Sequence, residues 1–340
     1  MLESIGHHPA MDVSAQAADA CVGRVLRTDR GLSSVLTEGG LVRAGLGGRL
    51  LARVAHQPDD APCTGDWVLL RHWPDHRVTL EEVLPRRTAL VRATAGEQSH
   101  GQVLCANHDL AAVVVALHPE PVLARVERLL TLAWESGATP VVLLTKADLV
   151  GDAPQVAEDV AAAAPGVRVI CTSTRTDEGL SEIRALVEGT RTMALLGASG
   201  HGKSSLANAL AGADLLGTRQ IRADGRGRHT SVRRELVPLP GGGAVIDTPG
   251  LRGIGLVRAE GGLEHAFADI DGLAAGCRFG DCRHEQEPGC AVLAAVEQGS
   301  LPLRRLESWR RLHREMSWSA KRAEQRERAA RRRRARGTGS

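Results

Sequence analysis

The chain has very few aromatic residues and almost no lysine. Among its 340 residues there are five Trp, two Phe and no Tyr, which disfavours a binding surface built from many stacked rings. Of the 43 basic residues, 40 are arginine and only Lys146, Lys203 and Lys321 are lysine. Where a chain uses arginine nearly everywhere, a retained lysine indicates a need for a compact point charge.

Long apolar runs and a secretory signal are also missing. The longest apolar runs, such as Leu110–Leu117, are far shorter than the roughly 18–20 residues that a membrane helix needs. The N-terminal segment has no basic stretch followed by an apolar core. Seven cysteines are an odd number, and four stand alone: Cys21, Cys63, Cys105 and Cys171. This does not resemble a disulfide framework, so we expect a cytoplasmic, reduced protein without a membrane partner.

Charge is unevenly distributed, although the formal net charge is only +3. Residues 301–340 carry 14 basic and 4 acidic side chains, so the first 300 residues are net acidic. Such a body does not bind nucleic acid by bulk charge, but the basic end can contact phosphate groups. Residues 321–340 equally fit a charged helix or a solvated, disordered end, and their composition leaves both possibilities open.

Length and composition predict a multidomain α/β protein. Between Cys21 and Arg92, short stretches rich in Val, Leu and Arg are separated by Gly, Pro and Asp, which favours a small β-barrel. These expected strands are Cys21–Leu26, Gly40–Ala44, Gly48–Val54, Asp66–Arg71 and Arg77–Val83. We expect a loose leader over 1–20, an OB-type barrel over 21–95, an α/β domain over 105–258, a helical domain over 259–320 and a basic tail over 321–340.

Strands and helices alternate in the expected α/β domain. Apolar runs predict buried parallel strands at Leu110–Leu117, Thr139–Leu144, Val167–Cys171, Thr192–Leu196 and Ala244–Ile246. Apolar spacing predicts helices at Val122–Trp134, Glu178–Val187 and Lys203–Ala211. Residues 215–233 are rich in Arg, Gly and Thr without periodicity, which predicts a loop.

A glycine-rich loop follows one of these strands and precedes a helix. It matches G-x-x-x-x-G-K-[ST], the pattern whose backbone amides cradle phosphates. The residues of this phosphate loop are Gly197, Ala198, Ser199, Gly200, His201, Gly202, Lys203, Ser204 and Ser205. Lys203 would supply charge to the β- and γ-phosphates, and Ser204 a ligand to Mg²⁺. His201 is expected to be exposed, with a contact to the γ-phosphate as the alternative.

Three further loops complete the pattern of a guanine-nucleotide site. Asp247-Thr-Pro-Gly250 follows a strand, so the carboxylate can hold Mg²⁺ and the Gly250 amide can sense the γ-phosphate. Thr145-Lys146-Ala-Asp148 resembles the guanine-reading N-K-x-D motif, in which the Asp accepts two hydrogen bonds from guanine. Ser173 and Thr174 resemble the loop that approaches guanine O6, although alone they fit an ordinary helix cap.

The order of these loops is unusual. The guanine-reading loops precede the phosphate loop, whereas in an ordinary GTPase they come last, so the parts are circularly permuted. Thr230, with Ser231 as second choice, is the expected Mg²⁺ and γ-phosphate contact in the Arg-rich loop. Leu251 stands where a Ras-like enzyme carries a water-orienting Gln, which predicts slow intrinsic hydrolysis. His229 and His201 are candidates to complete the site.

Three of the seven cysteines lie together with a histidine, at Cys277, Cys282, His284 and Cys290. Three thiolates and one imidazole within 14 residues are typical of a closed, structural Zn²⁺ site. The alternative is a set of unrelated free cysteines and a surface histidine.

Taken together, these motifs resemble the RsgA (YjeQ) family of ribosome small subunit-dependent GTPases, from about Gly23 to Arg314. Supporting segments include Gly65-Asp-Trp-Val68, Ala106-Asn-His-Asp109 and Gly227-Arg-His-Thr230. The resemblance implies an oligonucleotide-binding barrel, Mg²⁺-dependent GTP hydrolysis stimulated by the small ribosomal subunit, and a zinc domain that docks on rRNA in late subunit maturation. Thr145, Thr174, His201 and the long basic tail depart from the family pattern.

Two other functions remain open from the sequence. Because no Gln follows D-T-P-G, the chain could be a nucleotide-gated RNA-binding scaffold without turnover. It could also be a permuted GTPase that acts on the large ribosomal subunit. We expect a monomer with GTP or GDP, magnesium and one zinc ion as its ligands.

Overall fold

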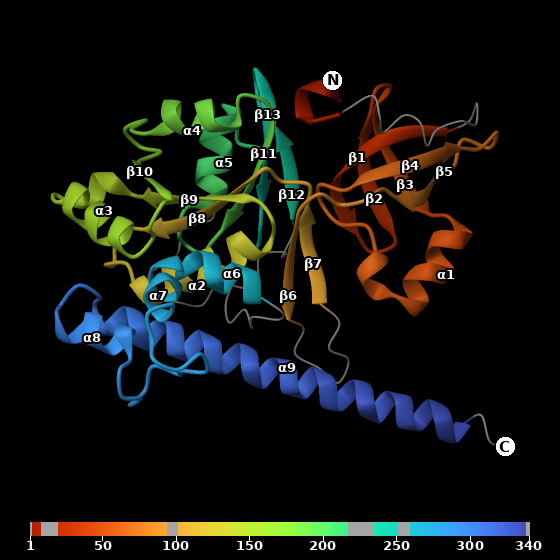
Figure 1. Cartoon of the computed structure of the whole chain (residues 1–340). Helices are drawn as coiled ribbons and strands as arrows, with labels where there is room; N and C mark the ends of the chain where they lie inside the picture. The colour runs from red at the N-terminus through yellow and green to blue at the C-terminus, as the bar shows by residue number, and fades with distance from the viewer. Residues whose placement is uncertain (1, 8–19, 94–100, 217–233, 251–258, 338–340) are drawn as a thin grey trace, which may run out of the picture.

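The computed structural model describes residues 2–7, 20–93, 101–216, 234–250 and 259–337. A β-barrel, a central sheet flanked by helices, and a helical C-terminal part follow one another along the chain (Figure 1). The expected multidomain α/β architecture is therefore confirmed. No helix among the described residues is long and apolar enough to cross a membrane.

The N-terminal barrel is closed by five strands in the order β1-β2-β3-β5-β4. Its strands are β1 (Ala20–Asp29), β2 (Leu32–Thr37), β3 (Gly40–Leu46), β4 (Trp67–His72) and β5 (Val78–Val83). Alternating apolar residues such as Val25, Val35 and Leu80 fill its interior. Five short strands closed in this order agree with the expected OB-type barrel.

One expected barrel strand is wrong. Gly48–Val54 was predicted as a strand, but the chain forms helix α1 (Gly48–His56), followed by the 3₁₀ turn η3 (Pro58–Asp60). Leu50 is fully buried and Val54 half-buried, whereas the intervening residues are exposed. Apolar contacts four residues apart suit one face of a helix and not the two-residue repeat of a strand.

The central sheet has six strands in the order β10-β9-β8-β11-β13-β12, all parallel except β12. The strands are β8 (Leu110–Ala116), β9 (Thr139–Thr145), β10 (Arg168–Thr172), β11 (Gly189–Leu196), β12 (Glu235–Pro238) and β13 (Gly242–Asp247). The intervening helices are α2 (Leu123–Glu135), η4 (Ala147–Leu149), α3 (Ala153–Ala162), α4 (Leu180–Val187) and α5 (Lys203–Ala211). All strands and helices expected in this domain are present, with ends shifted by a few residues.

The two faces of the sheet are covered by different helices. Alternate residues of β8 and β9, such as Val113 and Val142, pack with α2 and the C-terminal helices. Their neighbours Val114 and Leu143 pack with α4 and α5. Because the sheet is buried on both faces, its strands read as continuous apolar runs.

Barrel and sheet are joined by the hairpin of β6 (Ala89–Ala93) and β7 (Gly101–Ala106) and by a buried arginine. Arg24 is 1% exposed and donates hydrogen bonds to the carbonyls of Gly65, Asn107 and Ile5.

Part of the expected loose leader is packed against the body. Leu2 is the N-cap of the turn η1 (Glu3–Ile5), and Ile5 is its last residue. Both are buried, because residues three apart on a helical turn share one face.

The C-terminal part consists of α6 (Glu260–Ala266), α7 (Ala268–Ala274), α8 (Ala291–Glu297) and the long α9 (Leu303–Gly337). Figure 1 shows α9 running along one side of the body and past it. Within the stretch 321–340, expected to be either a charged helix or a disordered tail, the described residues 321–337 continue this helix. Near its start, Arg305 is 1% exposed and pairs with Glu127 of α2 and Asp269 of α7.

Candidate nucleotide site and metal cluster

The phosphate loop turns between β11 and α5 in a conformation that needs glycine. Gly200 and Gly202 have φ angles of 86° and 83°, which side-chain-bearing residues rarely adopt. A Cβ atom at Gly197 would lie 2.3 Å from the carbonyl oxygen of Val114 on β8. The loop is therefore pressed against the end of β8, and its curl presents the backbone for anion binding at the start of α5.

Lys203 is held at the start of α5 with its ammonium inside the loop. Its side chain is buried, and Nζ donates hydrogen bonds of 2.9 Å to the carbonyl oxygens of both Gly197 and Ala198. Burial lowers the pKa of Lys203, and the nearby Asp247 carboxylate opposes that shift. The loop thus holds an ammonium close to the position where phosphate oxygens would bind.

Ser204 and Asp247 bring the phosphate loop and β13 together. Ser204 Oγ donates a 2.6 Å hydrogen bond to Asp247 Oδ2. Burial raises the pKa of Asp247, whereas the hydrogen bond from Ser204 and the charge of Lys203 lower it. Asp247 Oδ1 is buried without a hydrogen-bond partner among the described residues. A hydroxyl and a carboxylate with a free oxygen are suitable donors for Mg²⁺, so these residues fit that ion.

Gly250 lies against the phosphate loop. A Cβ atom at this position would be 2.5 Å from the backbone nitrogen of Ser199. Thr248 anchors the same segment because its hydroxyl donates to the carbonyl of Leu195 on β11. The D-T-P-G segment therefore meets the phosphate loop where Gly250 approaches Ser199.

The T-K-x-D loop is tied to the phosphate loop by a threonine hydroxyl. Thr145 Oγ1 donates a 2.8 Å hydrogen bond to the carbonyl oxygen of His201. Lys146 follows with a φ of 62°, a left-handed conformation that turns the chain sharply after β9. The hydroxyl of Thr145 thus links the two loops directly.

Asp148 and Ser173 meet where β9 and β10 end. Ser173 Oγ donates a 2.6 Å hydrogen bond to Asp148 Oδ1, and Arg175 Nε lies 3.3 Å from Oδ2. Thr174 is exposed between them. Sequence reasoning missed Arg175, although its place directly after Ser173 and Thr174 was a usable signal.

The expectation that His201 is exposed is wrong. The residue is half-buried, and its Nδ1 lies 3.1 Å from the carbonyl oxygen of Val114. The ring therefore turns toward the Val114 carbonyl of β8. Ser205 lies half-buried in the first turn of α5. Thr230, Ser231, His229 and Leu251 lie outside the described residues.

Four side chains before α8 form a cluster with metal-ligand geometry. The sulfur atoms of Cys277, Cys282 and Cys290 and a ring nitrogen of His284 all lie within 4.8 Å of one another. Cys277 Sγ is 3.8 Å from Cys290 Sγ, and His284 Nδ1 is 3.6 Å and 3.4 Å from these atoms. A tetrahedral Zn²⁺ with bonds of about 2.3 Å to sulfur separates its ligands by about 3.8 Å. The donors therefore fit zinc.

The cluster is attached to the helices around it. Cys290 is the N-cap of α8 and accepts a 3.4 Å hydrogen bond from the Leu293 amide. The ring of His284 packs beside Trp309 of α9 at 5.3 Å between centroids. Arg310 of α9 donates to the His284 carbonyl. These contacts fix the loop on α8 and α9.

Comparisons with known proteins agree with this geometry. The family model described as RsgA GTPase matches residues 83–257. A Streptomyces avermitilis protein named small ribosomal subunit biogenesis GTPase RsgA is 52% identical over 86% of this chain and 79% of its own length. RsgA 2 of Lactiplantibacillus plantarum is 41% identical over 91% of this chain and 87% of its own.

Solved structures show the same fold. The crystal structure of YjeQ from Thermotoga maritima has a TM-score of 0.65 and 25% identity, covering 87% of this chain and 98% of its own. YloQ, titled a circularly permuted GTPase, has a TM-score of 0.60 and 24% identity, covering 93% and 99%. The permuted order of loops expected from the sequence is thus shared with solved relatives. With the family model spanning half of its length and relatives this similar, the chain belongs to the RsgA GTPase family and is a GTP hydrolase.

Proposed function

We propose that the chain binds GTP with Mg²⁺ at the junction of these loops, hydrolyses it to GDP and phosphate, and acts in late maturation of the small ribosomal subunit. The subunit and its rRNA are the proposed partners and stimulate turnover. Relatives up to 52% identical to this chain are named small ribosomal subunit biogenesis GTPases, which supports this proposal. We further propose that the protein acts as a monomer in the cytoplasm.

The phosphates and magnesium are assigned to the loops around α5. Backbone amides of residues 197–205 cradle the phosphates, and Lys203 exchanges its loop carbonyls for phosphate oxygens. Ser204 and, from outside the described residues, Thr230 hold Mg²⁺, with Asp247 placed to bind it directly or through water. The Gly250 amide contacts the γ-phosphate and so senses whether it is present.

The base is assigned to the loops after β9 and β10. Asp148 accepts hydrogen bonds from guanine N1 and N2, and the stem of Lys146 packs over the ring. The backbone at Ser173 and Thr174 approaches guanine O6. Thr145 takes the linking role expected of Asn, because its hydroxyl already bonds the His201 carbonyl.

The zinc ion is assigned to the C-terminal domain, and RNA contacts are assigned to both the N-terminal barrel and the C-terminal domain. Cys277, Cys282, His284 and Cys290 hold one structural Zn²⁺, which organises a segment with little core of its own. We propose that the barrel, residues 21–95, and the zinc domain, residues 259–320, contact rRNA on either side of the GTPase domain, residues 105–258. The basic tail, residues 321–340, adds phosphate contacts.

The observation that carries the proposal is the Ser204–Asp247 hydrogen bond beside Lys203, which assembles the magnesium and phosphate groups in one place. The test is GTP turnover measured alone, with small ribosomal subunits and with large subunits. We expect slow turnover alone and stimulation only by small subunits. Lys203→Ala, which removes the phosphate-binding ammonium, is the negative control and should show no GTP turnover. Turnover absent under all conditions would favour the scaffold alternative, and stimulation by large subunits would refute the assigned partner.

A further inference from the structure

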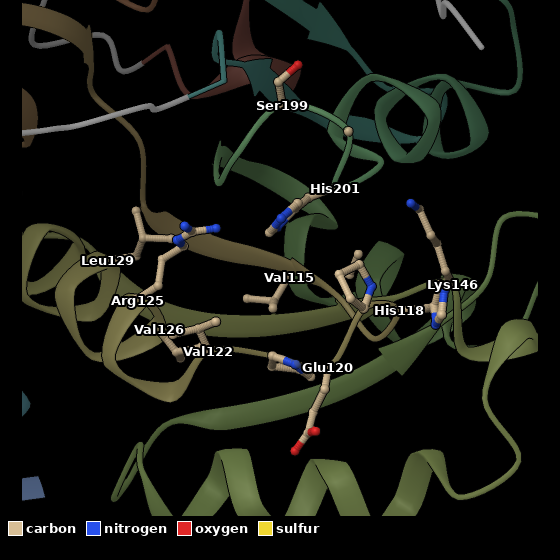
Figure 2. Close-up of a pocket in the computed structure, with 14 residues that line it drawn as sticks. Val115, His118, Glu120, Val122, Arg125, Val126, Leu129, Lys146, Ser199 and His201 are labelled. Carbon is tan, nitrogen blue, oxygen red and sulfur yellow. The ribbon is translucent and has the colours of Figure 1, made fainter. Parts of the chain in front are cut away.

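A cavity of about 260 Å³ lies beside the phosphate loop. One wall is the end of β8, at Val115 and Ala116, and a second is the segment 118–122 with the first turns of α2. Residues 199–201 of the phosphate loop and Lys146 close the remaining side (Figure 2). The cavity therefore lies between the start of α2 and the nucleotide loops.

This cavity adjoins the proposed nucleotide site and shares Lys146 and residues 199–201 of the phosphate loop with it. None of the groups assigned to magnesium or to the guanine edge lines it: Ser204, Asp247, Asp148 and Ser173. His201, which does line it, turns its ring toward β8 and away from the start of α5. A ligand here would touch Lys146 and the phosphate loop without contacting the groups assigned to the guanine edge or to the magnesium ion.

The interior surface is largely apolar. Val126 and Leu129 of α2 are 1% and 5% exposed, and Val115 of β8 is 5% exposed. Val122 lies at the rim and is 60% exposed. An apolar surface of this kind, facing an open cavity, favours a ligand with a compact apolar body.

The rim is cationic. Arg125 has neither an ion pair nor a hydrogen bond among the described residues, whereas Arg128, one turn further along α2, pairs with Glu315. Figure 2 shows the Arg125 guanidinium directed toward His201, while the Glu120 carboxylate points away from the other lining groups. Lys146 adds a second positive charge. An anionic group would complete this arrangement.

We propose that the cavity binds a small organic anion with an apolar, ring-sized body and one carboxylate, and that it is a second ligand site of this protein. The body packs on Val115, Val122 and Val126, and the carboxylate pairs with Arg125. This goes beyond the proposed function, because the ligand is not the nucleotide.

The proposal can be tested with 2-naphthoate as the probe and calorimetry on the full-length protein. We expect saturable binding to one site, both without nucleotide and with saturating GDP. The neutral analogue 2-naphthalenemethanol and inorganic phosphate should each bind at least about tenfold more weakly, because each lacks one of the two recognised features.

Two variants locate the probe. Arg125→Gln removes the cation and should weaken binding about tenfold or more, and Val122→Trp fills the cavity from its exposed rim and should abolish binding. Arg168→Gln removes an exposed arginine elsewhere on the domain and should leave binding unchanged. Unchanged GDP affinity shows that each variant is folded.

The proposal is overturned by any of four results. These are no saturable naphthoate binding up to 1 mM, competition with GDP for one site, binding unaffected by both cavity variants, or phosphate binding as tightly as naphthoate. The second result would make the cavity part of the nucleotide site. Equally tight binding of phosphate would mean that the apolar surface does not contribute to recognition.

Discussion

The hydroxyl of Ser204 donates a 2.6 Å hydrogen bond to the carboxylate of Asp247, 43 residues later in the chain. Asp247 ends β13, and Ser204 lies in the first turn of α5, which follows the neighbouring parallel strand β11 through the phosphate loop. Ligands of α/β sheets bind at this edge of the sheet. The bond holds the hydroxyl and the carboxylate close enough together to contribute to one Mg²⁺ site.

Ser204→Ala should uncouple magnesium from the nucleotide. The variant keeps the loop backbone and Lys203 but loses the hydroxyl ligand, so turnover should fall by on the order of 100-fold. GDP binding without Mg²⁺ should change little. Turnover and magnesium-dependent GDP affinity measure the two effects. Ser205→Ala, the adjacent hydroxyl, is the control, and equal losses in both variants would contradict the assignment.

Thr145→Val tests the link between the base loop and the phosphate loop. Valine preserves the shape but removes the donor to the His201 carbonyl, which should weaken GDP binding about three- to tenfold. Thr145→Asn restores a donor and should recover most of the loss. The test is the GDP dissociation constant of wild type, Thr145→Val and Thr145→Asn. If Thr145→Val binds GDP as tightly as wild type, the hydroxyl is dispensable.

Loss of one cluster thiol should remove the zinc. Cys282→Ser leaves three donors, so the protein should lose its stoichiometric zinc, and residues 277–290 should become sensitive to proteases. Metal analysis and limited proteolysis measure this outcome. Cys21→Ser, on the barrel, should keep one zinc per chain. Zinc retained at full occupancy in Cys282→Ser would mean that the cluster is not the site.

Most of the nucleotide site could be predicted because its loops are short, contiguous motifs with fixed spacing. Helix α5 begins at Lys203, where the pattern placed it. The ring direction of His201 could not be predicted, because it depends on a carbonyl of β8 far away in the sequence. The cavity was also missed, since its walls come from β8, α2 and two loops that only the fold brings together.

The contact between α9 and the neighbouring helices could not be predicted from the sequence either. Arg305 lies 178 residues after Glu127, and nothing in local composition pairs them. The guanidinium also bonds Asp269 and the carbonyls of Ala163 and Ala266, so one side chain joins α9, α2, α7 and the end of α3. Periodicity predicts which residues are buried, but not which buried charges meet.

Arg305→Lys should therefore destabilise the protein despite retaining the charge. Lysine cannot reproduce the planar set of hydrogen bonds, and Glu127, which is fully buried, would lose part of its compensation. Breaking a buried pair of this kind costs about 3–5 kcal/mol. Urea unfolding measures the loss. Arg304→Lys, whose half-exposed arginine also contacts Glu127, should cost far less, and equal costs would contradict the argument.

His108 makes stability depend on pH. Its ring is fully buried, with Nε2 3.2 Å from Ser136 Oγ at the end of α2 and with Nδ1 lacking a hydrogen-bond partner among the described residues. Burial, with a smaller contribution from Arg24 and opposition from Asp109, lowers its pKa from 6.5 to about 4. Because the folded pKa lies below the unfolded one, the unfolded chain binds more protons between these values.

Stability contributed by neutral His108 is thus present above pH 6.5 and is lost as pH falls toward 4, by up to about 3 kcal/mol. His108→Gln cannot titrate and should show a shallower fall in unfolding free energy over this window, whatever its stability at neutral pH. Urea unfolding at a series of pH values measures the slope. His76→Gln, which changes an exposed histidine, should keep the wild-type slope. Since linkage concerns the difference in bound protons, identical slopes for His108→Gln and wild type would mean that the buried ring does not resist protonation.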